Sequence, residues 1–460
     1  MSSTSTSHLI FPSAASNFSS TLNSLKRSTL SIPNRLRSII SDAEFVCALS
    51  SSYGLPLIAN ERCGSWYIPP DRKVGSAYFK STDGHMGQWA FSLRRLNLDL
   101  LGILGDAKGG IIVDSTRRGK VMPDALSKTV PIWCAVLNRA LFPENVDAHA
   151  LYTPPDAVSR SEHSQIEERL NGFARQFLEL KLDLTRLREQ VKEPLRPMWV
   201  TRDSFLQNES LQNGSVRLEG FVPVVLCTAS KHIKGWEGSE GGYIQGAGDD
   251  SEGWARGLTP PVFWKYREEL MGCPETELPD RIAQYVAEEA KWKPAGGRFS
   301  LVSPTTQVFI GLKQSAMELE FGPSDLLIDC GSKPLEFASS KLKSRYLHLS
   351  CRQGKLGSRD LRSQLPKLPA FLRSKSNFNH LYISCPTGKD LSAGVALAVL
   401  CLFTDDNAQM VGLQGASPST KLRQSFTKQY IRQKLSWIMT SVPSASPSRT
   451  TLQSINDFVL

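Results

Sequence analysis

The sequence lacks long apolar runs, paired cysteine motifs and, over its first 41 residues, any acid. Its longest apolar stretch, residues 391–403, contains one Ser and one Gly and is shorter than the roughly 20 residues that cross a bilayer. No membrane span is therefore expected. The nine cysteines are scattered and never spaced as C-x-x-C, which argues against a disulfide framework or a zinc ribbon. We expect a soluble protein of a reducing compartment, the cytoplasm.

The acid-free N-terminus is rich in Ser and Thr and carries only four Lys and Arg residues. Organelle transit peptides and disordered tails share this composition. No apolar core of a secretory signal precedes a small-residue cleavage site. We favour a disordered tail over residues 1–38, and a targeting segment stays open as the alternative.

The remaining chain is long and apolar enough to bury two or three cores, since 40% of its 460 residues are hydrophobic. The predicted class is α/β. Short apolar runs broken by Gly and Pro predict a mixed α+β region over residues 39–310. Alternating strands and helices predict an α/β domain over residues 323–442, followed by a second tail at 443–460. An apolar stripe at three- and four-residue steps predicts one long helix over residues 166–191, with Ser164 and Glu167 as its capping box.

Positive charge is concentrated in one part of the chain. The net charge is +10, and residues 341–375 hold ten Lys and Arg against one acid, Asp360. A solvated face is the ordinary interpretation of such a run. Because charge elsewhere is balanced, a polyanionic partner is the more economical interpretation.

A strand predicted at residues 380–384 runs through a short loop into a helix at 393–403. Backbone N–H groups that converge at a helix N-terminus favour an anion. The loop resembles the signature loop of dual-specificity phosphatases, in which Cys385 would be the nucleophile and an Arg would stand at Leu391. Without that guanidinium, the clamp on phosphate and part of the thiolate stabilisation are lost. We predict phosphate binding without phosphatase chemistry, with a purely structural turn as the alternative. The predicted phosphate-binding residues are Cys385, Thr387, Gly388, Lys389, Asp390, Leu391 and Ser392.

Two further segments combine charge with turn-forming residues. The apolar run 110–113 ends in Asp114, and hydroxyl and cationic side chains follow up to Lys120. An acid, hydroxyl donors and cations together suit a polyphosphate ligand with a metal. The glycine-rich segment 246–254 contains Asp249, Asp250 and Glu252, which suit magnesium or ribose hydroxyls. Surface solvation is the alternative for both segments.

Six segments together resemble one family, the initiator tRNA phosphoribosyltransferases of fungi and plants. They are residues 62–67, 79–85, 89–101, 111–133, 243–254 with 258–260, and 385–392. The resemblance as a whole covers about residues 39–403. The family joins a distinctive N-terminal region to a C-terminal domain like that of dual-specificity phosphatases. The resemblance implies a transferase that moves a ribosyl phosphate from phosphoribosyl pyrophosphate to the ribose 2′-hydroxyl of a T-stem purine. Its partners would be initiator tRNA, which is thereby kept out of elongation, and phosphoribosyl pyrophosphate.

This reaction needs the charge of the leaving pyrophosphate neutralised and a proton removed from the attacking hydroxyl. Magnesium is the expected cofactor. The candidate catalytic residues are Asp114, Asp249 and Asp250, and the candidate magnesium ligands are Asp249, Asp250 and Glu252. The residues expected to bind phosphates of the donor or of the tRNA are Arg62, Lys80, Ser115, Thr116, Arg117, Arg118, Lys120 and Lys231. The residues expected to contact the tRNA backbone are Arg345, Arg352, Lys355, Arg359 and Arg362.

Two other functions stay open at this point: a phosphatase acting through Cys385, which Leu391 argues against, and a non-catalytic tRNA-binding factor. The sequence leaves the oligomeric state open. Because Asp114 and Asp250 stand in polar, loop-like sequence, we expect Asp114→Asn and Asp250→Asn to abolish transfer and leave the fold nearly intact.

Overall fold

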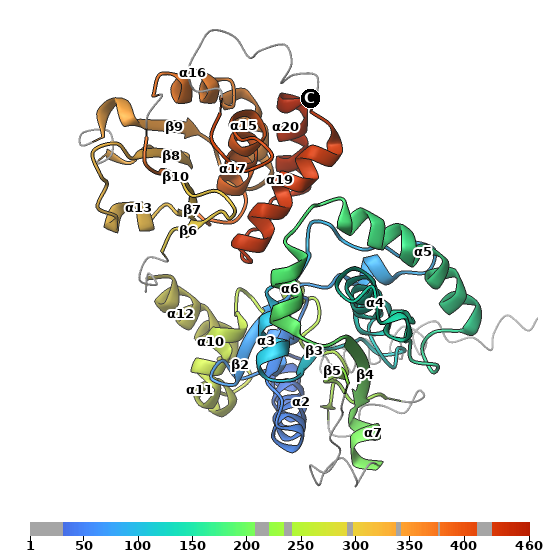
Figure 1. The fold of residues 1–460 in the computed structure, drawn as a ribbon. Coiled ribbons are helices and arrows are strands. Elements are labelled where there is room, and N and C mark those ends of the chain that lie inside the picture. Colours follow the sequence, from blue (N-terminus) through green and yellow to red (C-terminus); the bar gives the residue numbers. More distant parts are fainter. Residues whose placement is uncertain are drawn as a thin grey trace, which may run out of the picture. The chain divides into compact units, whose positions relative to one another are not determined.

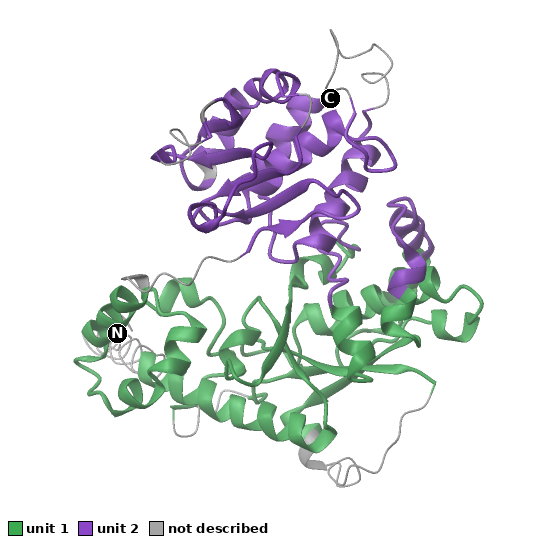
Figure 2. Cartoon of the chain, turned by 60° about the vertical axis from the view of Figure 1, so that its left-hand side comes forward, with its two compact units in different colours: residues 1–90, 100–170, 188–291 green, residues 91–99, 171–187, 292–460 purple. Residues whose placement is uncertain are grey.

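The computed structural model describes residues 31–207, 220–233, 242–291, 298–336, 342–375, 378–411 and 426–460. The chain forms two compact units (Figure 2). The first comprises residues 1–90, 100–170 and 188–291, and the second comprises 91–99, 171–187 and 292–460. Both units are built on a five-stranded sheet, which confirms the α/β class.

The sheet of the first unit is entirely parallel, more regular than the mixed arrangement expected. Its strands are β1 (Leu57–Asn60), β2 (Lys73–Ala77), β3 (Gly110–Asp114), β4 (Leu195–Thr201) and β5 (Val222–Thr228), in the order β2-β1-β3-β5-β4. The chain leaves β1 toward β2 and then returns to the other side of β1 as β3. In such sheets ligands bind where the order reverses, at the carboxyl ends of the strands. Here that place lies between β1 and β3.

Helices cover both faces of this sheet (Figure 1). On one face α2 (Ile32–Tyr53) packs against Ala59 and Val113 in one apolar core. The same core includes residues of α10 (Pro260–Lys265), α11 (Arg267–Gly272) and α12 (Leu278–Lys291). On the other face lies α3 (Leu100–Asp106), whose Leu104 approaches Gly110 of β3. The start of α2 corrects the predicted tail, because residues 32–38 are helical and Leu36 is fully buried. The rest of the predicted tail, residues 1–30, lies outside the described residues.

The single helix expected over residues 166–191 is instead two helices, α5 (Arg160–Leu178) and α6 (Leu184–Val191). The chain turns between them, with Lys181 at a φ of 52°. The predicted capping box is also wrong, because α5 begins four residues before Ser164. Its first turn is capped instead by Ser159, whose Oγ accepts a hydrogen bond from the backbone N–H of Glu162.

The sheet of the second unit is parallel except at one edge. Its strands are β6 (Ser300–Leu301), β7 (Val308–Leu312), β8 (Leu326–Gly331), β9 (Tyr346–Ser350) and β10 (Leu381–Cys385), in the order β6-β7-β10-β8-β9. Only the pairing of β6 with β7 is antiparallel. Because β7 pairs with β10, this domain begins before residue 323, which corrects the predicted boundary. The strand expected at 380–384 is confirmed as β10, and the alternation of strands and helices expected over this domain is confirmed as well.

One face of this sheet is covered by α15 (Gly354–Gln364), α17 (Leu391–Phe403), α19 (Lys428–Ser441) and α20 (Arg449–Val459) (Figure 1). The last of them, α20, corrects the predicted tail at 443–460. It buries Ile455 and Val459 in the same core as α17, so that this helix is part of the folded domain.

The remaining helices are four to 14 residues long, and the first of them is almost entirely buried. They are α4 (Val130–Leu141), α7 (Arg202–Gln207), α9 (Ser251–Trp254), α10 (Pro260–Lys265), α11 (Arg267–Gly272), α12 (Leu278–Lys291), α13 (Ser315–Glu318) and α16 (Lys367–Arg373). Single turns lie at Gly64–Tyr67, Ser81–Gly84, Ala125–Thr129, Val146–His149 and Lys343–Arg345. Within the described residues, no helix combines the length and apolar character that would span a bilayer.

Candidate active site

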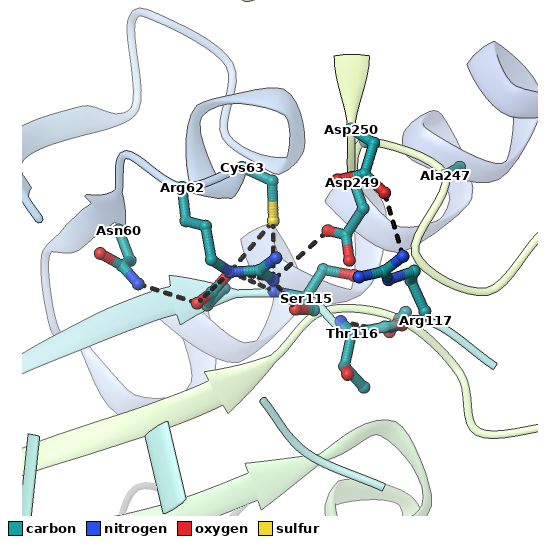
Figure 3. Close-up of polar contacts among 12 residues, drawn as sticks. Asn60, Arg62, Cys63, Ser115, Thr116, Arg117, Ala247, Asp249 and Asp250 are labelled. Carbon is teal, nitrogen blue, oxygen red and sulfur yellow. Dashed lines mark hydrogen bonds and ion pairs between the residues drawn. The ribbon is translucent and has the colours of Figure 1, made fainter. Parts of the chain in front are cut away.

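Polar side chains gather where β1 and β3 end, at the point where the strand order reverses (Figure 3). Asn60 is the last residue of β1 and Asp114 is the last of β3. The amide Nδ2 of Asn60 donates to Oδ2 of Asp114 at 2.8 Å. Asn60 itself is fixed, because its side chain both accepts from and donates to the backbone of Phe79.

Arg62 connects two carboxylates that are far apart in the sequence. Its Nη2 lies 2.9 Å from Oδ1 of Asp114 and 3.3 Å from Oδ1 of Asp249. Its Nε donates to Oδ2 of Asp114 at 3.2 Å, so the pair with Asp114 is bidentate. Arg62 Nη2 also donates to the carbonyl oxygen of Ser115. The guanidinium therefore fixes the end of β3 against the loop that carries Asp249.

Asp114 is saturated with donors and has no exposed surface. Besides Asn60 and two nitrogens of Arg62, it accepts from the Cys63 thiol at 3.0 Å and from the Ser115 N–H at 2.7 Å, five hydrogen bonds in all. Two carboxylate oxygens offer about four lone-pair sites. The expectation that Asp114 stands in an accessible polar loop is wrong, because the carboxylate belongs to the buried framework of the site.

Cys63 and Gly64, which follow Arg62 in the chain, also contact the end of β3. Burial, together with the charges of Asp114 and Asp249, raises the pKa of Cys63 well above its ordinary value, so the group is a thiol that donates to Asp114. Gly64 approaches β3 so closely that an added Cβ would stand 2.2 Å from the carbonyl oxygen of Val113. Only a glycine fits at this position.

Asp249 is held in place by its own backbone. Its N–H donates to Gly246, its carbonyl accepts from the Trp254 indole N–H at 3.0 Å, and the preceding Gly248 N–H donates to the Tyr67 hydroxyl at 2.8 Å. The side chain is only 4% exposed. Burial raises the pKa of Asp249 above its ordinary value, and the charge of Arg62 opposes that rise.

Asp250 differs sharply from its neighbour. Its side chain is 73% exposed and pairs at 3.2 Å with Arg117, which is equally exposed. Glu252 is exposed as well and does not line the cavity described below. Among the described residues, no group of three or more His, Cys, Asp or Glu side chains is arranged to hold a metal ion. The three-acid magnesium site expected at Asp249, Asp250 and Glu252 is therefore not formed by these residues.

A cavity of about 450 Å³ opens beside these side chains. Its charged and aromatic lining consists of Arg35, Arg117, Arg118, Tyr243, Asp249, Asp250 and Trp254. The Arg35 guanidinium lies 5.3 Å from the centroid of the Trp254 ring and donates to the carbonyl of Ala247 at 3.0 Å. Burial lowers the pKa of Arg35 somewhat, against the raising influence of Asp249 and Asp250.

Several predicted phosphate ligands lie away from the cavity lining. Lys120 pairs with Asp124 at 2.8 Å. Lys80 is half-buried, and Lys231 is exposed and donates its backbone N–H to Tyr243. Ser115 and Thr116 are buried. The structure thus brings Arg62, Asp114, Arg117, Arg118, Asp249 and Asp250 together. Ser115 joins them through its backbone, because its N–H donates to Asp114 and its carbonyl accepts from Arg62. Lys80, Lys120 and Lys231 do not line the cavity.

Sequence reasoning missed three contributors to the site. Arg35 falls within the predicted tail, residues 1–38. In the structure it belongs to α2, and Ile39, four residues further along this helix, is fully buried. Asn60 carries no motif, but its position at the end of a buried strand was a usable signal. Asp42 of α2 is fully buried and accepts from the Tyr243 hydroxyl at 2.8 Å, which ties the cavity wall to α2. Nothing in the local sequence indicates that last contact.

The predicted phosphate loop of the second unit connects β10 to α17. The Cys385 thiol is buried 3.1 Å from the Ser392 hydroxyl, and Gly388 adopts a φ of 65° against the backbone of Gly311. Leu391, at the place of the phosphatase arginine, is buried in the core shared with α20. The clamp that phosphatase chemistry needs is absent at that position.

Asp390 has a structural role that was not expected. Its Oδ1 accepts from the N–H of Ser448 at 2.8 Å and from the hydroxyl of Thr451 at 2.6 Å, so it anchors the start of α20. A carboxylate used in this way is not a phosphate ligand. Lys389 and Thr387 are exposed and remain available to an anion.

The cations predicted to meet the tRNA backbone differ in their surroundings. Arg345 donates to the carbonyls of Gly322 and Asp325, so its role is structural. Arg352 is bound to Asp360 through two contacts of 2.8 Å, and Arg362 lies 3.0 Å from Asp457. Arg359 is exposed, and the Lys355 side chain lies outside the described residues. The positive segment is therefore partly neutralised.

Comparisons with known proteins match nearly the whole chain. The family described as the Rit1 N-terminal domain matches residues 25–287, and the Rit1 DUSP-like domain matches residues 345–459. An uncharacterized protein of Schizosaccharomyces pombe is 36% identical over 93% of this chain and 94% of its own length. The tRNA A64-2′-O-ribosylphosphate transferase of Saccharomyces cerevisiae is 32% identical over 95% of this chain and 93% of its own length.

Proposed function

The chain belongs to the family of the Rit1 N-terminal and Rit1 DUSP-like domains, and from this premise we propose that it is a tRNA 2′-O-ribosylphosphate transferase. The donor would be phosphoribosyl pyrophosphate, and the acceptor the ribose 2′-hydroxyl of a T-stem purine in initiator tRNA. The modification would keep that tRNA out of elongation. Support comes from the Saccharomyces cerevisiae relative, whose name specifies A64 of tRNA and its 2′-oxygen and which aligns over both domains.

The observation that carries the proposal is the composition of the cavity beside Asp249. Arg35, Arg117 and Arg118 place three guanidinium groups around it, at the switch point of the sheet. Guanidinium groups bind phosphate through paired, charge-assisted hydrogen bonds. A donor with a 5-phosphate and a pyrophosphate needs such a lining. The carboxylates of Asp249 and Asp250 complete it with acceptors for hydroxyl groups.

Magnesium fits this lining as an ion brought in by the donor. Magnesium in phosphate sites is usually held by one or two carboxylates, waters and substrate phosphates, so no cage of three acids is required. Asp250, exposed at the cavity, is the carboxylate best placed to hold it. When bound, the ion would supply positive charge to the departing pyrophosphate. The exposed Arg117 and Arg118 would contribute to the same neutralisation.

The acceptor hydroxyl requires little distortion of the tRNA. In an A-form stem the 2′-hydroxyl groups line the wide, shallow minor groove, and recognition depends on shape and backbone contacts. Exposed cations such as Lys389 and Arg359 would bind phosphates of the RNA or, at Lys389, of the donor. We place the reaction in the cytoplasm, since all nine cysteines fall within the described ranges and none forms a disulfide.

Transfer can be tested directly with phosphoribosyl pyrophosphate labelled in its ribose and with purified initiator and elongator tRNA. We expect label to enter initiator tRNA in a magnesium-dependent reaction, with pyrophosphate released. Binding of tRNA without incorporation of label would instead support the non-catalytic factor. Release of inorganic phosphate from either substrate would support the phosphatase.

A further inference from the structure

Two exposed turns of the first unit are joined by one carboxylate. Residues 85–88 and residues 117–120 each form a turn, closed by a hydrogen bond from the N–H of the last residue to the carbonyl oxygen of the first. Asp124 connects the turns, because its Oδ2 lies 2.8 Å from Nζ of Lys120 and 3.6 Å from Nε2 of His85. The two turns therefore belong to one surface, which we call the two-turn surface.

The first turn is fixed to the end of β1. Asn60, the last residue of that strand, holds the backbone of Phe79 through two hydrogen bonds of 3.0 and 2.8 Å. Closer to the turn, an added Cβ at Gly84 would stand 2.6 Å from the carbonyl oxygen of Asp124, so the backbone is tightly packed there. Within the turn, Met86 is 68% exposed. The fold thus holds an apolar side chain in water at a fixed position.

The second turn is continuous with the cavity. Gln245, which lines the cavity, donates to the carbonyl oxygens of Arg117 and Lys120 at 3.2 and 2.8 Å. The two turns together contain three Lys and Arg residues and no acid. Asp124, the carboxylate that joins them, is only 15% exposed. The charge that the two-turn surface offers to a partner is therefore positive.

The acceptor of the proposed reaction cannot enter the cavity whole. A volume of about 450 Å³ suits a small molecule, whereas the acceptor hydroxyl belongs to a double-stranded stem. In an A-form stem the 2′-hydroxyl groups and base edges lie in the wide, shallow minor groove. The stem must therefore rest on a surface beside the cavity, with its minor groove toward the protein.

Resting on the proposed function, we propose that the two-turn surface binds the minor groove of the tRNA T-stem. Lys120 binds a phosphate of the RNA backbone, which positions the stem. His85 and Gln88 form hydrogen bonds with ribose hydroxyls or base edges. Met86 packs against ribose carbons in the groove. The arginines of the second turn stay with the donor, at the border between this surface and the cavity.

Filter binding of labelled initiator tRNA to the full chain, without donor, measures the contribution of this surface. Met86→Glu brings a negative charge against the RNA, and Lys120→Gln removes a positive one. We expect the dissociation constant to rise about tenfold or more in each variant. Lys120→Gln leaves Asp124 paired with Lys128 at 3.0 Å. Because neither changed residue lines the cavity, the Michaelis constant of the donor should stay unchanged.

Two matched controls lie elsewhere in the first unit. Val146→Glu changes an apolar residue that is 71% exposed and lies beyond the far end of α4, a helix about 18 Å long. Lys108→Gln removes an exposed lysine that precedes β3, whereas Lys120 follows that strand. Both controls should bind tRNA as the unmodified protein does.

A photoreactive side chain gives a readout that does not depend on affinity. Met86→benzoylphenylalanine should cross-link to the T-stem of initiator tRNA on illumination. The control Val146→benzoylphenylalanine should not cross-link. Mapping the modified nucleotides identifies the stem that lies on the two-turn surface.

Normal tRNA affinity in both Met86→Glu and Lys120→Gln would overturn the inference, and so would a cross-link to a different stem. A raised donor Michaelis constant with normal tRNA affinity would overturn it as well, since the surface would then serve the donor. Failure of the proposed function looks different, because binding is measured without donor. An unmodified protein that binds tRNA through this surface but transfers no label would refute the proposed function alone.

Discussion

Arg62 and Asp114 form a bidentate ion pair, with contacts of 2.9 and 3.2 Å, although the Asp114 side chain has no exposed surface. Breaking a buried pair by removing one partner leaves the other charge uncompensated, which typically destabilises by about 3–5 kcal/mol. We expect Asp114→Ala to lower the free energy of unfolding by that amount in urea titrations. The exposed Asp250→Ala should change it by at most about 1 kcal/mol. Equal stability of both variants would show that the Asp114 network is not structural.

Gly64 should tolerate no side chain. An alanine Cβ there would stand 2.2 Å from the Val113 carbonyl and would push the Arg62 loop away from β3. We expect Gly64→Ala to lose both stability and transfer activity, measured by thermal unfolding and the label assay. Gly172→Ala is the matched control, since nothing lies within 4 Å of its Cβ position in α5. It should stabilise the helix by up to about 1 kcal/mol.

Cys385→Ser and Lys389→Ala separate the two interpretations of the loop before α17. If the loop binds phosphate through backbone amides, Cys385→Ser should keep most transfer activity. Lys389→Ala should weaken binding of donor or tRNA by about 1.5–3 kcal/mol, the range for hydrogen bonds to charged groups. The Michaelis constant that rises identifies whose phosphate is bound. An inactive Cys385→Ser with a normal Lys389→Ala would point to a nucleophilic thiol.

The affinity for tRNA should fall with rising salt concentration, and only some of the cations in residues 341–375 should contribute to this dependence. Arg359 is exposed, and no ion pair reaches it from the described residues, whereas Arg362 already lies 3.0 Å from Asp457. We expect Arg359→Gln to reduce the slope of log affinity against log salt by about 1, and Arg362→Gln to reduce it less. Filter-binding titrations across a salt series measure both. Identical slopes in both variants and in the unmodified protein would exclude Arg359 and Arg362 from the surface that binds tRNA.

Lys434 should make the second unit less stable at neutral pH than in mild alkali. The residue is fully buried, with Nζ 3.8 Å from the Trp437 ring and 2.5 Å from the carbonyl of Asp405. Burial lowers the pKa of Lys434 from 10.5 to about 8. Between these two values the unfolded chain binds a proton that the folded chain does not, so stability rises as the pH increases. Unfolding measured from pH 7 to 10 should show this rise and lose it in Lys434→Met. The same dependence of stability on pH in Lys434→Met and in the unmodified protein would contradict this prediction.

The sequence predicted well whatever depends on local pattern. The strand, loop and helix around Cys385 are confirmed because their apolar runs and turn residues are contiguous, and the family resemblance is confirmed because its motifs are long. The segments that carry Arg117 and Asp249 were each singled out from their charge and turn residues, and both residues line one cavity. These features need no knowledge of distant contacts.

The errors concern contacts between distant segments. Asp114 looked accessible, because nothing near it reveals that Asn60, Arg62 and Cys63 converge on its carboxylate. Arg345 looked like an RNA contact, yet it binds carbonyls about 20 residues away in the chain. Side chains of the same type thus take structural or functional roles according to which neighbours the fold supplies.

The position of α20 has a consequence for synthesis on the ribosome. Because α20 buries Ile455 and Val459 against α17 and is anchored by Asp390, the second unit lacks part of its core until α20 has been translated and has left the ribosome. The first unit, whose last helix ends at Lys291, can fold while translation continues. A stop codon before α20 would therefore damage the second unit and spare the first.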